Sequence, residues 1–464
     1  MNQKNVEENE MNPVSVIYED RVIGVIGMGY VGVTLAVGLA DAGFQIYGVE
    51  KAEAVLEQLH QMKPGFYEQD LEEHLIRHLK SGRIQVSRDI PADQGIRTYI
   101  VTVGTPVGPD KKIRLEPIME VGRQLADVLK DGDMVILRST VKVGVTRHTV
   151  LPLLQAGGAS VDLAFCPERT VEGKALSELS SLPQIVSGLT ESACLRAARL
   201  FSFLTPTVIK VGSLETAELA KLVSNTIRDV NFAFANEIAL ICEPLNINMS
   251  EIIHATTLHY PRCNLSAPGP VGGPCLEKDP YILAESLELH NVVPKLTLTG
   301  RKINEELPNR SAERIAEILR AYTEGKGTVR PEITILGMAF KGSPETDDLR
   351  GSMAFPLIEA IRKQFPDAAL RIFDPVISPG KLAKLSLAGV QVANTLEEAF
   401  KGTHVAVIQN NHPVFRSMPL HQLAGTMDSP AIVYDFWNLF QGRDDDVRQF
   451  KYIALGARMD GEEQ

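Results

Sequence analysis

The stretch VIGVIGMGYVG, residues 22–32, decides the fold. Its apolar start predicts a buried strand, residues 30–43 have the pattern of a helix, and residues 44–50 predict the next strand. Three glycines form G-x-G-x-x-G at the turn between strand and helix. In a Rossmann fold they permit the tight turn, the approach of a pyrophosphate and the packing of the helix on the sheet. The predicted dinucleotide site consists of Gly27, Met28, Gly29, Tyr30, Val31 and Gly32.

An acidic residue supports this interpretation. Glu50 ends the second predicted strand, 18 residues after Gly32. A carboxylate at this place accepts hydrogen bonds from both ribose hydroxyls and repels a 2′-phosphate. We therefore expect NAD rather than NADP. The alternative is a glycine-rich turn that holds no ligand.

Length and composition limit the protein class. The 464 residues suit two or three domains, and the net charge of −11 lacks the basic excess that nucleic-acid binding requires. Five scattered cysteines without a C-x-x-C pair fit neither a disulfide framework nor a zinc site. Residues 1–20 lack the apolar core of a signal peptide, and no apolar run reaches about 18 residues. We expect a cytoplasmic protein without metal, nucleic-acid or membrane partners.

Strands and helices alternate along the first part of the chain, which predicts a parallel sheet with helical crossovers. The further predicted strands are residues 98–106, 133–140, 161–168 and 205–212. The middle of the chain is helical in residues 213–245, 279–289, 292–307 and 309–322. A second alternation then places strands at residues 333–340, 369–375, 403–409 and 431–437.

This order predicts an α/β protein with a helical domain between two α/β domains. The expected parts are a disordered tail (1–20), a Rossmann domain (21–212), a central helical domain (213–322), a linker (323–332) and a C-terminal Rossmann-like domain (333–464).

A second motif carries candidate chemistry. The stretch GPVGGPCLEKDP, residues 269–280, places Cys275 and Asp279 four residues apart, behind several glycine and proline residues. If one helix holds both, their side chains share a face. Lys221 and Asn225 have the same spacing on the long predicted helix. Cys275 is either a nucleophile that the loop presents to a substrate or a buried, inert thiol.

With these motifs the chain resembles the UDP-glucose/GDP-mannose 6-dehydrogenase family, and within it the branch that acts on UDP-N-acetylhexosamines. The resemblance covers about residues 21–437 and rests on separate motifs in family order. They are GVIGMGYVG, VGTP, RSTVKVGVT, CPERTVEG, ELAKLVSNTIRDVNFAFANE, PGPVGGPCLEKDP and GMAFKGSPETDDLRGS.

The resemblance implies an activity and an assembly. Such enzymes oxidise the C6 alcohol of a nucleotide sugar to a carboxylate with two NAD per turnover, and the uronic acid feeds polysaccharide biosynthesis. The middle domain then mediates dimerisation, and the C-terminal domain holds the nucleotide sugar. We therefore expect a homodimer or higher homo-oligomer whose substrate is UDP-ManNAc or UDP-GlcNAc.

The resemblance also implies residue roles. Cys275 forms a thiohemiacetal and then a thioester, while Asp279, Lys221, Asn225 and Thr140 handle protons, the reacting oxygen and water. Glu168 binds the sugar and acts as a general base, which a glutamate does near neutral pH only where burial raises its pKa. Further implied NAD contacts are Gly104, Thr105, Thr140, Glu172 and Arg350. Implied substrate contacts are Glu168, Lys221, Asn225, Arg262 (reaching the neighbouring subunit's site), Gly272, Phe340 and Lys341.

Three departures leave alternatives open. The loop reads PGPVGG where the N-acetylhexosamine branch usually has P-G-P-G-V-G-G, and two extra residues separate Lys341 from Arg350. Lys278 is typical of UDP-glucose enzymes, so UDP-glucose is the alternative substrate. From other classes, a two-electron 3-hydroxyacid dehydrogenase would need neither Cys275 nor the second α/β unit, and an NAD-binding regulator would have no activity.

Overall fold

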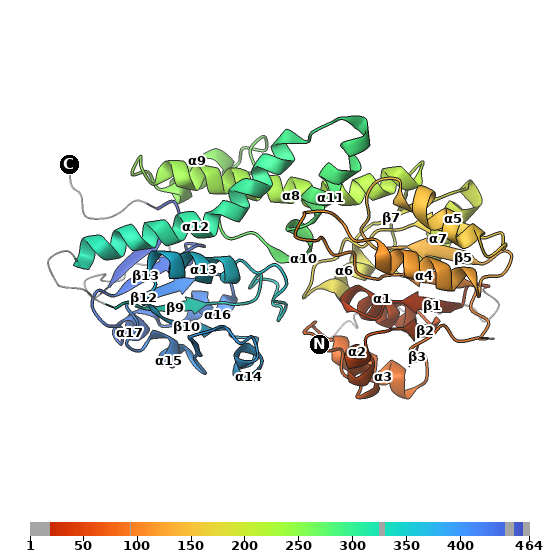
Figure 1. The fold of residues 1–464 in the computed structure, drawn as a ribbon, viewed down its shortest axis with the longest axis horizontal. Helices are drawn as coiled ribbons and strands as arrows, with labels where there is room; N and C mark the ends of the chain where they lie inside the picture. Colours follow the sequence, from red (N-terminus) through yellow and green to blue (C-terminus); the bar gives the residue numbers. More distant parts are fainter. Residues whose placement is uncertain (1–18, 93, 324–329, 441–449, 458–464) are drawn as a thin grey trace, which may run out of the picture. The chain divides into compact units, whose positions relative to one another are not determined.

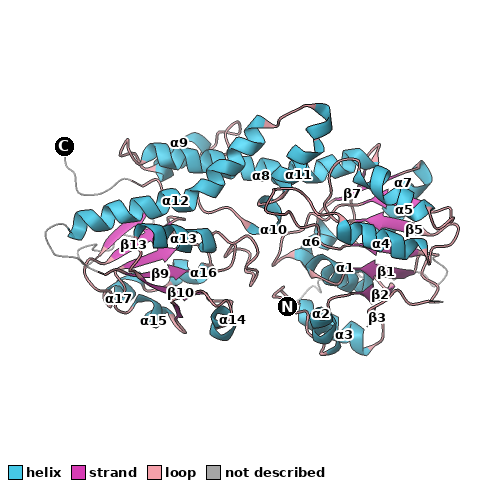
Figure 2. Cartoon of the chain, viewed as in Figure 1, coloured by secondary structure: helices cyan, strands magenta, loops and turns pink. Residues whose placement is uncertain are grey.

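The structure is a computed structural model that describes residues 19–92, 94–323, 330–440 and 450–457. Its contacts divide the chain into two compact units, with the boundary between Val223 and Ser224. Each unit contains one β-sheet (Figures 1 and 2). Most of the predicted tail and linker lies outside the described residues. Asp20, at the end of the predicted tail, is buried and pairs with Arg196, so the folded part includes it.

The first unit contains an eight-stranded sheet in the order β3-β2-β1-β4-β5-β6-β7-β8. The order of its first six strands, 3-2-1-4-5-6, is that of a dinucleotide-binding Rossmann domain. The strands are β1 (Val22–Ile26), β2 (Gln45–Val49), β3 (Ile84–Ser87), β4 (Thr98–Val101), β5 (Met134–Leu137), β6 (Asp162–Phe165), β7 (Gln184–Gly188) and β8 (Val208–Lys210).

One pairing departs from the parallel sheet that the sequence predicts. Strand β7 runs antiparallel to β6, with Ala164 opposite Gly188 and Phe165 opposite Ser187. Short apolar runs carry no information on strand direction, which here depends on the route of the loop and helix between the two strands. The other pairs in this sheet are parallel.

Alternate side chains of this sheet enter two separate cores. Ile100 and Ile136 belong to one apolar cluster, whereas Val101 and Val135 belong to another. The strands are therefore buried on both faces, which explains their continuous apolar sequence. The helices of the first unit are α1 (Tyr30–Asp41), α2 (Glu53–His60), α3 (Leu71–Lys80), α4 (Glu116–Ala126), the π-helix η1 (Thr146–Val150), α5 (Leu151–Gln155), α6 (Ala175–Ser181) and α7 (Glu191–Phe201).

The second unit repeats the order of the first six strands of the first unit. Its six parallel strands follow the order β11-β10-β9-β12-β13-β14, which is again 3-2-1-4-5-6 in chain order. They are β9 (Glu332–Leu336), β10 (Ala369–Phe373), β11 (Val390–Val392), β12 (Val405–Ile408), β13 (Ile432–Asp435) and β14 (Lys451–Ala454). The helices around this sheet are α13 (Ala354–Gln364), α14 (Pro379–Ala383), α15 (Leu396–Phe400), α16 (Pro413–Ser417) and α17 (Leu420–Ala424).

The helices predicted for the middle of the chain share a core with the second sheet. Ala235 and Ala239 of α8 (Leu214–Cys242) lie in one apolar cluster with Ile315 of the helix α12 (Lys295–Thr323) and Ile335 of β9. The remaining elements here are α9 (Met249–Thr257), α10 (Gly273–Leu276), α11 (Asp279–Ser286) and the 3-10 helix η2 (Glu288–His290). The predicted segments 292–307 and 309–322 form the single helix α12, which contains Pro308. One proline removes only one backbone hydrogen bond from a helix.

A glycine turn follows the first strand of both sheets. Gly27 has φ +96° and donates its N–H to Val49, and Gly337 has φ +92° and donates to Phe373, both at 2.8 Å. Positive φ favours glycine because it has no Cβ. The two turns therefore have the same construction, although the second begins GMAFKG instead of GMGYVG.

We expect two alanine substitutions in the first turn to differ in stability. A Cβ on Gly32 would lie 1.8 Å from the carbonyl oxygen of Gly27, whereas a Cβ on Gly29 would meet nothing within 4 Å. Gly32→Ala should lose about 3 kcal/mol or more of unfolding free energy. The control Gly29→Ala should stay within about 1 kcal/mol. Urea unfolding followed by circular dichroism measures both, and equal midpoints would contradict the packing role of Gly32.

Candidate active site

The first glycine turn has the features of an anion site. Helix α1 begins at Tyr30 with Gly29 as its N-cap, and neither a side-chain cap nor an acidic residue lies in its first turn. Its N-terminal amides are thus available to a phosphate. Glu50 Oε2 accepts a 2.9 Å hydrogen bond from the backbone N–H of Met28. Its Oε1 accepts hydrogen bonds from the backbone N–H groups of Lys51 and Ala52. The open space at Gly29 and the placement of Glu50 fit an NAD pyrophosphate and ribose.

The ends of β5 and β6 carry a buried ion pair. The Arg138 guanidinium donates to Glu168 Oε2 at 2.6 Å, and Glu168 Oε1 accepts from the backbone of Arg169 and Thr170. Burial alone would raise the pKa of the Glu168 carboxyl, but the Arg138 charge and the two amides outweigh it and lower the pKa. Glu168 is therefore held in its ionised form by Arg138 and the two amides, and its predicted role as a general base remains a prediction.

Other predicted NAD contacts lie in neighbouring loops of the same unit. Thr105 donates its hydroxyl to the carbonyl of Thr140 at 2.7 Å, which ties the loops after β4 and β5 together. A Cβ on Gly104 would meet nothing within 4 Å, as at Gly29. The loop that carries Glu172 is fixed by Glu68, which accepts 2.7 Å hydrogen bonds from the backbone of Gly173 and Ala175.

Tyr30 is tied to the same carboxylate. Its hydroxyl donates to Glu68, and its ring lies 4.7 Å from the ring of Phe66. Burial is the largest cause that raises the pKa of Tyr30, and the charges of Glu68 and Glu172 raise it further. Tyr30 therefore stays protonated and serves as a hydrogen-bond donor at the start of α1.

In the second unit, Cys275 is exposed on the short helix α10. Gly273 precedes it with φ +91° and donates its N–H to Gly351 at 2.9 Å. A Cβ on Gly273 would lie 2.4 Å from the Phe340 ring, and one on Gly272 would lie 2.0 Å from the Gly351 carbonyl. Only glycine fits these two positions, so the loop packs directly against the GMAFKG and DDLRGS motifs.

Asp279 is fully buried at the first residue of α11, the helix that follows α10. Cys275 and Asp279 thus belong to two consecutive helices and not to one, as the spacing had suggested. Asp279 Oδ2 accepts a 2.6 Å hydrogen bond from the Asn225 side chain of α8, while its Oδ1 bonds to no described group. Lys221 precedes Asn225 by one turn, and each is only 7 % exposed. The two predicted pairs are therefore connected through Asn225 and Asp279.

Four further predicted contact residues are more exposed than Asp279: Phe340 and Lys341 for the nucleotide sugar, Arg350 for NAD and Arg262 for the neighbouring subunit's site. The Lys341 ammonium lies 5.4 Å from the centre of the Phe340 ring. Arg350 forms an ion pair with Asp348 at 2.6 Å, and its side chain is 63 % exposed. The Arg262 guanidinium lies over the ring of Tyr260, 4.7 Å from its centre. The ligand roles of these residues remain predictions.

The other cysteines have environments typical of packing residues. Cys166 and Cys242 are buried, and burial raises the pKa of the Cys166 thiol to about 12. Cys194 and Cys263 are partly buried. Of the described cysteines, Cys275 is the exposed one, which distinguishes it as the candidate nucleophile.

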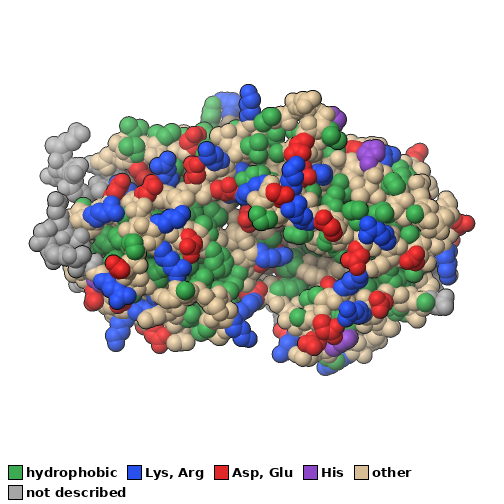
Figure 3. All heavy atoms as spheres, viewed as in Figure 1, with side chains coloured by type: hydrophobic (Ala, Val, Ile, Leu, Met, Phe, Trp, Pro, Cys, Tyr) green, Lys and Arg blue, Asp and Glu red, His purple; other side chains and the backbone are tan. Residues whose placement is uncertain are grey.

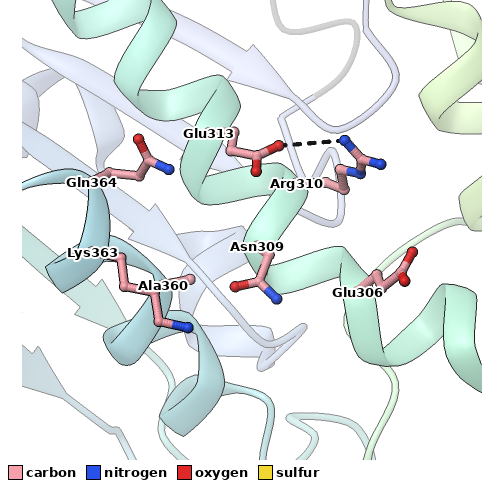
Figure 4. A pocket seen from close by; sticks show the side chains of 7 residues that line it. All are labelled: Glu306, Asn309, Arg310, Glu313, Ala360, Lys363 and Gln364. Carbon is pink, nitrogen blue, oxygen red and sulfur yellow. Dashed lines mark ion pairs between the residues drawn. The ribbon is translucent and has the colours of Figure 1, made fainter.

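Other surface features of the described residues carry no comparable chemistry. A hollow of about 410 Å³ between α12 and α13 has two acidic and two basic lining residues, whose charges cancel (Figure 4). Its lining is Glu306, Asn309, Arg310, Glu313, Ala360, Lys363 and Gln364. On the face in Figure 3, acidic and basic side chains are intermixed. Within the described ranges no cluster of potential metal ligands occurs, and no helix is long and apolar enough to cross a bilayer.

Several residues that shape the site escaped the sequence analysis. Arg138 directly precedes the Ser139–Thr140 pair of a recognised motif, so its position was a usable signal. Glu68 and Arg301 had no such signal, because an isolated glutamate or arginine is usually a solvated surface residue. Their burial and hydrogen bonds depend on tertiary contacts.

Comparison with known proteins covers most of the chain. Three domain profiles of the UDP-glucose/GDP-mannose dehydrogenase family match in order. They are the NAD binding domain at residues 21–204, the central domain at residues 215–306 and the UDP binding domain at residues 334–442.

Relatives and solved structures agree with these profiles. An NDP-N-acetyl-D-galactosaminuronic acid dehydrogenase from Ralstonia nicotianae is 30 % identical over 87 % of this chain and 93 % of its own length. A UDP-N-acetyl-D-mannosamine dehydrogenase from Pyrococcus horikoshii is 30 % identical over 89 % of this chain and 94 % of its own. The structure of UDP-D-ManNAc dehydrogenase from Pyrococcus horikoshii has a TM-score of 0.81 and 29 % identity, covering 94 % of this chain and 99 % of that one.

The fold class and the family resemblance predicted from the sequence are thereby confirmed. The family assignment decides against the 3-hydroxyacid dehydrogenase and the inactive regulator. The chain belongs to the UDP-glucose/GDP-mannose dehydrogenase family, and it is an NAD-dependent nucleotide-sugar dehydrogenase.

Proposed function

We propose that this dehydrogenase oxidises the C6 hydroxyl of a UDP-N-acetylhexosamine, UDP-ManNAc or UDP-GlcNAc, to the uronic acid. The observation that carries the mechanism is the exposure of Cys275, four residues before Asp279, whose buried carboxylate is bonded to Asn225. The substrate class is supported by the names of the relatives, which act on N-acetylated sugars. NAD, when bound, accepts one hydride in each of the two oxidations.

Cys275 divides the oxidation into steps that keep the aldehyde on the protein. The C6 alcohol first loses a proton and a hydride to become an aldehyde. The thiolate adds to its carbon, a C–S bond forms, and the carbonyl oxygen takes a proton. Loss of this proton and a second hydride gives a thioester. Water then attacks the thioester carbon, the C–S bond breaks, and the carboxylate and the thiolate are released.

Asp279 is our candidate for the group that takes a proton during these steps. Its carboxylate is buried, Oδ2 is oriented by Asn225, and Oδ1 bonds to no described group. A base needs a fixed orientation and an available lone pair, and Asp279 has both. Glu168, which forms an ion pair with Arg138, is our candidate for binding the sugar and for acting as a general base in thioester hydrolysis.

Lys221 is our candidate for stabilising the reacting oxygen. The residue is largely removed from water, at 7 % exposure. A positive charge stabilises a developing alkoxide more strongly where water is excluded. Phe340 and Lys341 are proposed to contact the nucleotide sugar, Thr140 the water and Arg350 the cofactor.

We further propose that α8 mediates a homodimer. Ile227, Phe234 and Ile241 follow each other at intervals of seven residues and are each about half exposed. This spacing places them on one face of the helix, and a row of exposed apolar side chains favours a partner surface. A second copy of the chain is the partner that the family resemblance implies.

The thiol should be required for complete oxidation. We expect the wild-type protein to form two NADH per UDP-sugar, and Cys275→Ala to lower kcat by at least about 10³-fold. Cys194→Ala, a partly buried cysteine elsewhere, is the control and should keep wild-type kcat. Cys275→Ser incubated with sugar and NAD should accumulate a stalled sugar species detectable by mass spectrometry. One NADH per sugar, or full activity of Cys275→Ala, would reject the mechanism.

The substrate assignment predicts a ranking of kcat/KM. The kcat/KM for UDP-ManNAc or UDP-GlcNAc should exceed that for UDP-glucose by about 10-fold or more. Protein groups that hydrogen-bond the N-acetyl amide are left without a partner when the substrate carries a hydroxyl at that place. Steady-state NADH formation with the three sugars measures this ranking. Preference for UDP-glucose would agree with Lys278 and replace the N-acetylhexosamine assignment.

The dimer proposal predicts a change of mass. Phe234→Glu places a charge in the middle of the apolar row and should shift the protein toward monomer in light scattering after gel filtration. Leu195→Glu, on an exposed site of α7, is the matched control and should leave the mass unchanged. A monomeric wild-type protein would contradict the proposal.

A further inference from the structure

Residues 269–276, a glycine-rich stretch that ends in the short helix α10 with Cys275, are held by a buried arginine of α12; this segment is called the loop below. Arg301 is 1 % exposed, and its guanidinium donates to two carbonyl oxygens of the loop. Nη2 bonds the Val271 carbonyl at 2.9 Å, and Nη1 bonds the Leu276 carbonyl at 3.1 Å. These two residues lie on either side of Cys275 in the chain. One planar group therefore spans the segment that bears the thiol.

A chain of buried polar groups fixes this arginine. Asp229 Oδ1 accepts from Arg301 Nη1 at 2.7 Å and from the Asn304 side chain at 2.9 Å. Asn304 in turn accepts from Asn236 at 2.9 Å. All four side chains are at most 1 % exposed.

The same network reaches the beginning of the loop. Asn236 donates to the Gly269 carbonyl at 3.1 Å and accepts from the Gly269 N–H at 2.8 Å. The network therefore contacts the loop at Gly269, Val271 and Leu276. Asn236 and Asp229 come from α8 and Arg301 from α12, so two long helices determine where the loop lies.

We propose that Arg301 is a positioning residue for Cys275, which acts through the loop backbone and touches neither substrate nor cofactor. The inference rests on the proposed function of Cys275. Gly269, Gly272 and Gly273 leave the loop backbone with more conformational freedom than other residues would. Two hydrogen bonds from one rigid fork remove much of that freedom, which the compact ammonium of a lysine does not do.

Position matters most for the step that captures the aldehyde. A displacement of about 1 Å can slow a reaction between held groups by about 100-fold. Slower thiol addition gives the aldehyde time to leave before the second oxidation. Loosening the loop should therefore change the fraction of turnovers that end as aldehyde.

The fraction of turnovers that end as aldehyde distinguishes a positioning role of Arg301 from a role in stability alone. Partial unfolding lowers the amount of active protein but leaves the ratio of products per turnover unchanged. The measurement is NADH formed per sugar consumed, together with aldehyde trapped by hydroxylamine and quantified by mass spectrometry. It requires no knowledge of the active fraction.

The variant to test is Arg301→Lys, which keeps the charge beside Asp229 but loses the fork. We expect trapped aldehyde to rise about 10-fold or more, NADH per sugar to fall below two, and alkylation of Cys275 by iodoacetamide to change rate. Arg310→Lys is the matched control on the same helix, because Arg310 is exposed and pairs with Glu313. It should behave as wild type in all three measurements.

A second variant tests the same role if Arg301→Lys folds poorly. Asn236→Ala removes both contacts to Gly269 and should shift the product ratio in the same direction. Wild-type product ratios in whichever of the two variants folds would overturn the positioning role, even if total activity fell. If the wild-type protein itself releases aldehyde or forms one NADH per sugar, the proposed function of Cys275 fails first, which distinguishes the two outcomes.

Discussion

A carboxylate at the end of the second strand holds the glycine turn in both sheets. Glu50 accepts from the Met28 amide at 2.9 Å, and Asp374 accepts from the Met338 amide at 2.7 Å. Parallel sheets bind ligands at the carboxyl ends of their strands, where these turns lie. In each sheet this bond therefore ties the glycine turn to the end of the neighbouring strand, at the edge where such sheets bind ligands.

The loop with Cys275 depends on a buried ion pair. Burying the Arg301–Asp229 pair requires removal of both charges from water, and a buried pair often adds little net stability over apolar residues. We therefore attribute the role of the Arg301–Asp229 pair to the position that it gives the loop, and not to stability. The arginine satisfies backbone carbonyls of a glycine-rich loop that has little regular structure of its own.

Much of the fold could be predicted from local sequence, because strand and helix periods and the G-x-G-x-x-G turn are local properties. The antiparallel β7 and the continuity of α12 through Pro308 could not, since both depend on tertiary packing. The site followed the same rule. Spacing suggested Cys275 with Asp279, yet the bond from Asn225 to Asp279 and the ion pair that lowers the pKa of Glu168 join residues far apart in sequence.

The two strand-end carboxylates differ in how many hydrogen bonds they already accept. A carboxylate has about four lone-pair sites. Glu50 accepts from three backbone amides and is partly exposed, so it retains capacity for a sugar hydroxyl. Asp374 accepts from four amides, those of Met338, Ala339, Val376 and Ile377, and is buried. The two units thus differ in the acceptor capacity of this carboxylate: the backbone of the second unit already occupies about as many acceptor sites of Asp374 as a carboxylate has.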